Sequence, residues 1–280
     1  MLKGKNILVI GGGISGISAA VEVAEVGHNV ILVEKLPYLG GRVIRMNQYF
    51  PKLCPPYCGL EINFRRIKQN PRIKVHINTV VEKIEGTKDN LTVQLKTSPE
   101  YVNENCTACG ECEKVCPVEI PDEFNYYLTS TKAIKLPHDL AFPFRYNINE
   151  SYCLKNECQK CIEVCDYNAI DLSATAKQFT IKVDSIIIAT GWNPYDACEI
   201  ENLNYNKSPD IITNVEMERI AAVNGPGKGE IFRPSDKTIP KKFVFVQCAG
   251  SRDEKHLQYC SAVCCAASLK QAINIRDNIP

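Results

Sequence analysis

The sequence predicts a Rossmann-like α/β fold that is interrupted by a smaller α+β domain. Two observations lead to this prediction. Residues 6–35, NILVIGGGISGISAAVEVAEVGHNVILVEK, read as a strand, a glycine turn, a helix and a second strand. Two cysteine runs then stand between later segments that again read as strands. The length of 280 residues suits about two domains.

Composition narrows the function classes. The chain is 45% hydrophobic and 23% charged, as in ordinary globular proteins, and its net charge of +1 gives no argument for a nucleic-acid partner. The 15 cysteines are the anomaly. The N-terminus enters a strand without a leader pattern, so we expect a cytoplasmic protein whose thiols bind metal or do redox chemistry. No apolar run approaches the roughly 20 residues needed to span a bilayer, so we expect membrane contact only through partners.

The N-terminal glycines fit the dinucleotide pattern G-x-G-x-x-G. The first glycine makes a tight turn, the second lets a pyrophosphate approach the backbone, and the third lets the helix pack on the strand. An acidic residue ends the second strand, where it is expected to accept ribose hydroxyls. A glycine turn without a ligand would leave this acid unexplained. The candidate residues here are Gly11, Gly13, Gly16, Glu34 and Lys35.

Two later segments favour FAD over NAD. LGGRV at residues 39–43 resembles the second phosphate-contacting turn of two-dinucleotide-fold flavoproteins, with Gly41 and Arg42 near the pyrophosphate. VDSIIIATGWNPYD resembles the strand that closes their FAD domain, with Thr190 and Gly191 near the flavin. Between them, HINTVVEKIEG and NLTVQLKTS alternate like a β-meander. Val81 of this meander stands where such flavoproteins contact adenine.

CTACGECEKVCP at residues 106–117 has the spacing C-x2-C-x2-C-x3-C-P of bacterial ferredoxins. A zinc site would not require this triple spacing. The second run, CLKNECQKCIEVCDYNAI at residues 153–170, has four residues between its first two cysteines, two more than the first run. Its first cysteine is therefore the less certain ligand. By the ferredoxin crossover, the fourth cysteine of each run binds the other cluster. One [4Fe–4S] cluster is then expected on Cys106, Cys109, Cys112 and Cys165, and the other on Cys116, Cys153, Cys158 and Cys161.

The ferredoxin segment is expected to be an insertion in the flavin fold. The chain would leave that fold near Tyr101 and return near Thr180. An insertion at a surface loop costs little closure entropy. The expected organisation is residues 1–100 and 179–223 for the FAD-binding domain, 101–178 for the two-cluster insert, and 224–280 for the start of a second nucleotide-like domain.

Cys54 and Cys58 stand in FPKLCPPYCGLE, where flavin disulfide reductases carry their redox dithiol. Such reductases usually have four residues between the sulfurs, and this chain has three, two of them prolines. Three interpretations stay open: a redox dithiol, a thiol near the flavin or a cluster, and inert packing. A reactive thiol needs access and a depressed pKa.

The C-terminal region reads as a strand, FVFVQ at 243–247, followed by a loop and a helix. A second glycine fingerprint would be expected after such a strand, but only Gly250 is present, so we expect no nicotinamide site here. A third [4Fe–4S] cluster is the first interpretation. Zinc or a reactive dithiol, and buried structural cysteines, are the alternatives. The thiols in question are Cys248, Cys260, Cys264 and Cys265.

Together, GGGISG, GGRV, CTACGECEKVCP, ATGWNPYD, RPSD and QCAGSRDE with YCSAVCC resemble the A-type polypeptide of heterodisulfide reductase. NQYFPKLCPPYCGLEINFRRI and LPHDLAFPFRY are closer to the A-type polypeptide of the quinone-interacting membrane-bound oxidoreductase of sulfate reducers. The resemblance implies an electron-transfer protein with FAD and [4Fe–4S] clusters, in an anaerobic complex on the inner face of the membrane. The implied partners are a related flavin and iron–sulfur protein, a haem-bearing membrane protein, and adenylylsulfate reductase as the soluble partner.

The predicted function is therefore electron relay through FAD and clusters. Three rival functions are a flavin-dependent disulfide reductase that uses Cys54 and Cys58, a heterodisulfide reductase partner that bifurcates electrons at FAD, and a metal-bearing scaffold without redox activity. Variants of the two thiols would test the first rival, flanking genes the second, and rapid flavin reduction and reoxidation the third.

Overall fold

The structure is a computed structural model that describes residues 4–279. It divides into two compact units. Of the described residues, 4–44, 57–121 and 130–191 form the first unit. Residues 45–56, 122–129 and 192–279 form the second.

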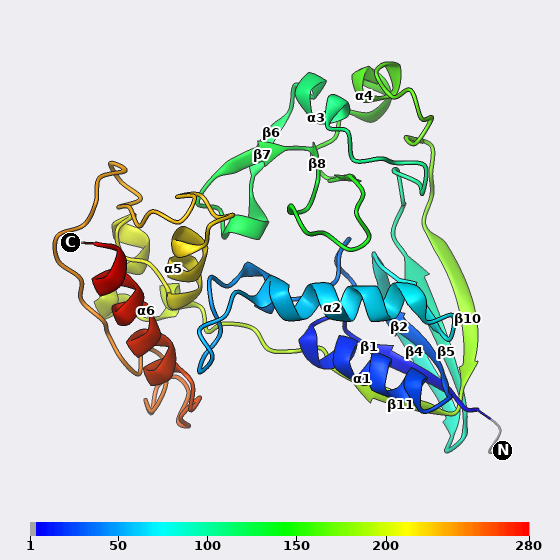
Figure 1. Ribbon diagram of the computed structural model, residues 1–280, viewed down its shortest axis with the longest axis horizontal. Helices are drawn as coiled ribbons and strands as arrows, with labels where there is room; N and C mark the ends of the chain where they lie inside the picture. The colour runs from blue at the N-terminus through cyan, green and yellow to red at the C-terminus, as the bar shows by residue number, and fades with distance from the viewer. Residues whose placement is uncertain (1–3, 280) are drawn as a thin grey trace. The chain divides into compact units, whose positions relative to one another are not determined.

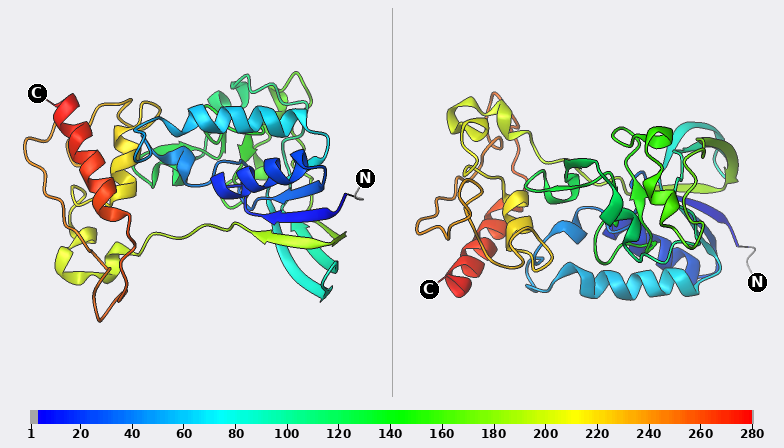
Figure 2. Two further views of the ribbon diagram at one scale, coloured as in Figure 1. Left: turned by 60° about the horizontal axis from the view of Figure 1, so that its bottom comes forward. Right: turned by 90° about the horizontal axis from the view of Figure 1, so that it is seen from above.

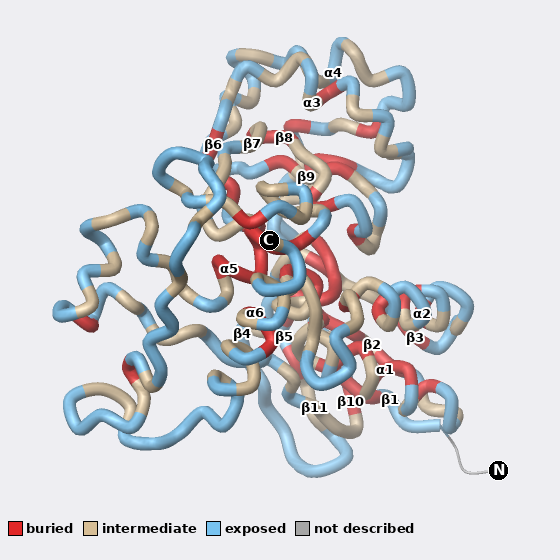
Figure 3. Tube along the Cα trace, turned by 60° about the vertical axis from the view of Figure 1, so that its left-hand side comes forward, coloured by how far each residue is buried: buried red, intermediate tan, exposed pale blue. Residues whose placement is uncertain are grey.

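A parallel sheet of order β11-β1-β2-β3 forms the centre of the first unit. Its two central strands, β1 and β2, are largely buried apolar runs, as expected of strands covered on both faces, whereas β3 and β11 are partly exposed (Figure 3). Leu8, Val9 and Leu32, for example, are fully buried. The strand bounds are β1 Asn6–Ile10, β2 Asn29–Val33, β3 Ile73–His76 and β11 Ser185–Ile188.

Two helices lie side by side against this sheet (Figures 1 and 2). Helix α1, Ile14–Glu25, packs on the parallel strands, and α2, Pro56–Gln69, runs beside it. Arg66 of α2 pairs with Glu22 and Glu25 of α1, with N–O distances of 3.2 and 2.7 Å. Both pairs are solvent-exposed and contribute at most about 1 kcal/mol each, so apolar burial is the main source of this packing.

An antiparallel sheet of order β10-β5-β4 packs on the parallel sheet through a shared apolar cluster. The strands are β4 Thr79–Thr87, β5 Asn90–Thr97 and β10 Lys177–Val183. Along β5, buried Val93 and Leu95 alternate with exposed Gln94 and Lys96, the period-two pattern of a half-buried strand. The predicted meander is therefore present, and its third strand comes from after the cysteine runs.

The inserted region leaves after β5 and returns at β10, which are hydrogen-bonded neighbours. At its neck, Val102 forms a bridge with Ile170, and Asp171 N donates to Tyr101 O at 2.8 Å. A small core contains Cys112, Ile134, Tyr146 and Ile148. The elements are α3 Glu111–Val115, β6 Glu119–Pro121, β7 Ser130–Lys132, β8 Ile134–Lys135, β9 Asn147–Ile148 and α4 Lys160–Glu163. Figure 1 shows α3 and α4 close together at the outer end of this region.

The second unit is built around α5, Asn214–Ala221, and α6, Cys264–Asn278. Its core includes Met217, Ile220 and Ile231, with Leu128 from residues 122–129 packed against them. Short 3-10 turns also occur in both units. They are Val43–Arg45, Glu123–Asn125, Lys155–Glu157, Ala197–Glu199, Glu201–Leu203 and Tyr205–Lys207.

The division of the chain differs from the predicted domain boundaries, since Arg45–Pro56, expected in the FAD-binding domain, belong to the second unit. Two other segments differ as well. The first unit ends after Gly191, where the parallel sheet has received its last strand, and not at residue 223. Residues 122–129 leave the insert and join the second unit, because Leu128 packs in its core. Side-chain packing between distant segments decides both differences, and a linear pattern does not record it.

The predicted strand at 243–247 is wrong. These residues have no regular secondary structure, and Val244 is 88% exposed and Val246 56% exposed. A parallel strand needs a neighbouring strand for its backbone hydrogen bonds, and the described part of the second unit contains no named strand that would serve. The predicted helix after it is present as α6.

No helix in residues 4–279 is both long enough and apolar enough to cross a membrane.

Candidate functional site

The glycine turn between β1 and α1 has a geometry that side chains would block. A Cβ at Gly16 would lie 1.8 Å from Gly11 O, and one at Gly11 would lie 2.3 Å from Ala189 O, with φ at +106°. At Gly13 the space is open, since the nearest atom, Gly41 Cα, is 4.0 Å away. Gly13 is also the N-cap of α1, which has no side-chain cap and no acid in its first turn. Such a helix N-terminus suits an anionic phosphate.

Glu34 lies where the sequence predicts the ribose-binding acid, directly after β2. Its side chain is buried, and each carboxylate oxygen accepts a backbone hydrogen bond, Oε2 from Gly12 N at 2.6 Å and Oε1 from Leu36 N at 2.8 Å. These two bonds fix the carboxylate at the glycine turn and leave lone pairs for hydroxyl donors. The neighbouring Lys35 is exposed.

The second turn, at residues 39–43, lies against the first. Gly40 N donates to Gly12 O at 2.8 Å, and Gly40 forms a bridge with Gly13. Gly40 and Gly41 have φ of +114° and +57°, which favour glycine, and a Cβ at Gly41 would be 2.9 Å from Gly13 Cα. The half-buried Arg42 follows. The two glycine turns and the acid therefore form one cradle that fits a dinucleotide.

The other predicted FAD contacts lie at the ends of their strands. Val81 stands at a register shift in β4 and packs on the shared apolar cluster. Thr190 and Gly191 are exposed just beyond β11, and Gly191 has a φ of +73° with open space where a Cβ would be. Their contact with flavin stays a prediction.

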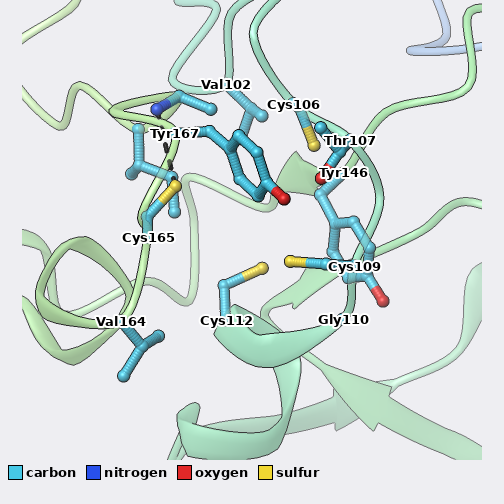
Figure 4. Close-up of a pocket in the computed structure, with 12 residues that line it drawn as sticks. Val102, Cys106, Thr107, Cys109, Gly110, Cys112, Tyr146, Val164, Cys165 and Tyr167 are labelled. Carbon is cyan, nitrogen blue, oxygen red and sulfur yellow. Dashed lines mark hydrogen bonds between the residues drawn. The ribbon is translucent and has the colours of Figure 1, made fainter.

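The first cysteine set surrounds one pocket. Cys106, Cys109, Cys112 and Cys165 all line it (Figure 4). Ala169 N donates to Cys165 Sγ at 3.4 Å, the hydrogen bond dashed in Figure 4. Burial, and then the neighbouring Cys106 and Cys109, raise the pKa of Cys112 to about 12. A thiolate at this position therefore needs a bound cation to offset its charge.

The second cysteine set surrounds another pocket, whose walls include Cys116, Cys153, Cys158 and Cys161. Burial, and then Cys153, raise the pKa of Cys161 to about 11. The longer first gap of this run is taken up by a 3-10 turn, Lys155–Glu157, and Lys155 N donates to Cys153 Sγ at 3.4 Å. Cys153 therefore stands with the other three thiols. Both pockets gather their cysteines in the predicted crossed sets, and ligation itself stays a prediction.

The donor set and its spacing favour a cluster over a single ion. In residues 4–279, no group of three or more His, Cys, Asp or Glu side chains is placed to hold one metal ion. A tetrahedral zinc site would bring four thiolates within about 2.3 Å of one point. Four thiols around a wider apolar pocket suit the corners of a [4Fe–4S] cube instead.

Two tyrosines that the sequence reasoning missed also line the first pocket. Figure 4 shows the Tyr167 ring extending from beside Cys165 into the space between the sulfurs. The buried Tyr146 lies beside Cys109 and donates from its hydroxyl to Glu113 Oε2 at 2.8 Å. No spacing rule marks Tyr146, because it stands 30 residues beyond the first run.

The third cysteine set lies in the second unit, and no described pocket is lined by all four thiols. Cys264 and Cys265 begin α6, and Cys260 Sγ accepts from Ala262 N at 3.3 Å just before it. Cys248 has a φ of +57°. Ser261 Oγ lies 2.9 Å from Cys264 Sγ. A third cluster on these residues stays a prediction.

Cys54 and Cys58 are both free thiols. Cys54 belongs to the second unit and is half-buried, with its Sγ 3.5 Å from Lys52 O. Cys58 belongs to the first unit and is exposed on α2. The two thiols thus belong to different units, and the three interpretations of this pair stay open.

Two protein families match parts of this chain. The family described as FAD dependent oxidoreductase matches residues 6–101, and the 4Fe-4S binding domain family matches residues 99–122. Among solved structures, L-proline dehydrogenase from P. horikoshii is similar over 37% of this chain and 20% of its own, at 19% identity and a TM-score of 0.28.

Curated relatives match nearly the whole chain. The A-type polypeptide of the H(2):CoB-CoM heterodisulfide,ferredoxin reductase from Methanothermobacter marburgensis is 36% identical over 98% of this chain and 41% of its own length. The iron–sulfur A-type polypeptide of the CoB–CoM heterodisulfide reductase from Methanocaldococcus jannaschii is 38% identical over 99% and 42%. A second iron–sulfur A-type polypeptide of this reductase, from Methanopyrus kandleri, is 40% identical over 98% of this chain and 42% of its own length. The chain thus spans about two fifths of the length of these relatives.

Proposed function

The chain belongs to the family of the A-type polypeptides of heterodisulfide reductase, and on this premise we propose that it relays electrons between bound FAD and two [4Fe–4S] clusters. One observation carries the proposal. A dinucleotide cradle and two four-cysteine pockets occur in a single compact unit, and the second sheet of the flavin fold is completed only after the chain has formed both pockets.

The residues present fit both kinds of cofactor. Gly13 and the α1 N-terminus would hold the pyrophosphate, Glu34 the ribose, and the cysteine sets the clusters. When bound, FAD exchanges electrons in pairs or singly, and each cluster exchanges one at a time. The chain would hold the cofactors with these residues, and backbone N–H groups donate hydrogen bonds to cysteine sulfurs, from Lys155 to Cys153 and from Ala169 to Cys165.

The crossed ligand sets can be tested by paired substitutions. Cys106→Ala with Cys165→Ala changes one pocket only, so about four irons per chain should remain in the other. Cys106→Ala with Cys116→Ala changes both pockets, so both clusters should be damaged. Iron and labile-sulfide analysis after anaerobic reconstitution measures the difference. The reverse pattern would show that each run holds its own cluster.

We further propose that the relay works in an anaerobic complex with a related flavin and iron–sulfur protein. The sequence similarity to the quinone-linked branch at 47–67 and 136–146 supports a haem-bearing membrane partner and adenylylsulfate reductase as electron acceptor. The third cysteine set is proposed to hold one more cluster. Purification of the native complex tests the partners. Co-purifying heterodisulfide-reducing proteins with a hydrogenase would replace the quinone-linked assignment with the bifurcating one.

A further inference from the structure

The two cysteine runs differ in charge at matching positions. Aligning their last three cysteines places Glu113 of the first run opposite Ile162 of the second. Likewise, Glu111 stands opposite Lys160. At these two positions the first run carries carboxylates where the second carries an apolar residue and a cation, while one position is reversed, with Lys114 opposite Glu163.

Glu113 is a half-buried carboxylate that is hydrogen-bonded to a residue of the first pocket. It directly follows Cys112, and its Oε2 accepts from the hydroxyl of Tyr146 at 2.8 Å. Tyr146 is 7% exposed and lines the pocket beside Cys109. Glu111, by contrast, is ion-paired with Lys114 at 2.6 Å on the exposed surface, so its charge is balanced within the run.

No carboxylate is among the residues that line either pocket, but lysines line the second pocket and not the first. The walls of the second pocket include Lys155 and Lys160, and Lys155 Nζ is paired with Glu150 at 2.7 Å. Glu157 and Glu163 are exposed, where solvent and salt screen their charges. The cysteine–amide hydrogen bonds do not distinguish the pockets, because each pocket has one of 3.4 Å.

A negative charge beside a cluster disfavours the addition of an electron, and a low-dielectric wall strengthens the effect. We propose that the cluster of the first pocket has the lower reduction potential, because Tyr146 of its wall holds the half-buried Glu113 carboxylate by a hydrogen bond, whereas lysines line the second pocket. This inference rests on the proposed electron relay. One electron on the first cluster then passes downhill to the second, which is reduced as the first is oxidised, without bond or proton changes. The relay is therefore directional.

The test is an anaerobic potentiometric titration of the reconstituted full chain, followed by electron paramagnetic resonance. Two reduction steps are expected, with at least a tenfold difference in reduced-to-oxidised ratio at a given potential, or about 59 mV for a one-electron couple. Glu113→Gln should raise the lower step and leave the upper one in place. Tyr146→Phe, which keeps the ring and frees the carboxylate, should raise the same step by less.

The matched control is Ile162→Glu, which places a carboxylate at the corresponding position of the second run and should lower the upper step only. Two clusters with the same potential, or an upper step that moves in Glu113→Gln, would overturn the inference while leaving the proposed function intact. A chain that assembles neither cluster would overturn the proposed function and this inference with it.

Discussion

At the scale of single residues, Gly16 tests the dinucleotide cradle. Gly16→Ala places a Cβ 1.8 Å from Gly11 O, so the turn must open and FAD should no longer co-purify. Gly59→Ala is the control, because its Cβ meets nothing within 4 Å in α2, and alanine there should stabilise by about 0.5–1 kcal/mol. Flavin absorbance of the purified variants measures both. Full FAD content in Gly16→Ala would contradict the cradle.

His76, at the end of β3, gives the first unit a pH dependence. Burial lowers its pKa from the ordinary value of 6.5. Because the folded-state pKa is lowered, the unfolded chain binds the proton more readily than the folded chain. The contribution of His76 to the free energy of unfolding is therefore fully present above about pH 6.5 and is lost as pH falls through the folded-state pKa. The urea midpoint should therefore fall more between about pH 7.5 and 5.5 in the natural chain than in His76→Asn. Equal falls would contradict this role.

Substitution of Cys54 and Cys58 distinguishes an electron relay from a dithiol reductase. If the protein is a relay, Cys54→Ala with Cys58→Ala should leave the rate of electron transfer from flavin to clusters within about twofold of the natural chain, a change below about 0.5 kcal/mol in barrier. Stopped-flow absorbance after reduction measures that rate. Loss of a disulfide-reducing activity with unchanged cluster reduction would instead favour the reductase.

At the scale of elements, residues 122–129 are held in the second unit by Arg219 of α5. This guanidinium is fully buried, donates to Asn125 Oδ1 at 2.9 and 3.0 Å and to Asn224 O at 2.8 Å, and lies 4.8 Å from the Phe124 ring centroid. Arg219→Lys keeps the charge but loses this planar fork. We expect a loss of about 3 kcal/mol and faster hydrogen exchange at residues 122–129.

The control for Arg219→Lys is Arg65→Lys, because Arg65 forms an exposed pair with Glu61 on α2. That pair contributes about 0.3–0.5 kcal/mol, so stability should scarcely change. Unfolding midpoints and exchange rates compare the two variants. Similar effects in both would show that the buried fork does not hold this segment.

Some features of these elements could be predicted from the sequence and others could not. The glycine turn and Glu34 were predictable from their spacing, and the grouping of the cysteines from the ferredoxin crossover rule. Tyr146 and Arg219 were not, because their partners Glu113 and Asn125 stand 33 and 94 residues away. The strand expected at 243–247 failed for a related reason: an apolar run becomes a strand only when another strand pairs with it.

At the scale of the whole molecule, the flavin-type fold and most of the cysteine-rich insert belong to one compact unit. The insert begins and ends on neighbouring strands, β5 and β10, so both halves of the flavin fold still pair normally. The chain spans about two fifths of its curated relatives, and the shared part contains both predicted kinds of redox cofactor site.

The cofactor content of the anaerobically reconstituted chain is the direct test for bound FAD and two [4Fe–4S] clusters. We expect about one FAD and at least about eight irons with matching sulfide per chain, from four irons in each of two clusters, and about twelve if the third cysteine set is also occupied. A colourless protein, with neither flavin nor iron–sulfur absorbance, would contradict this expectation.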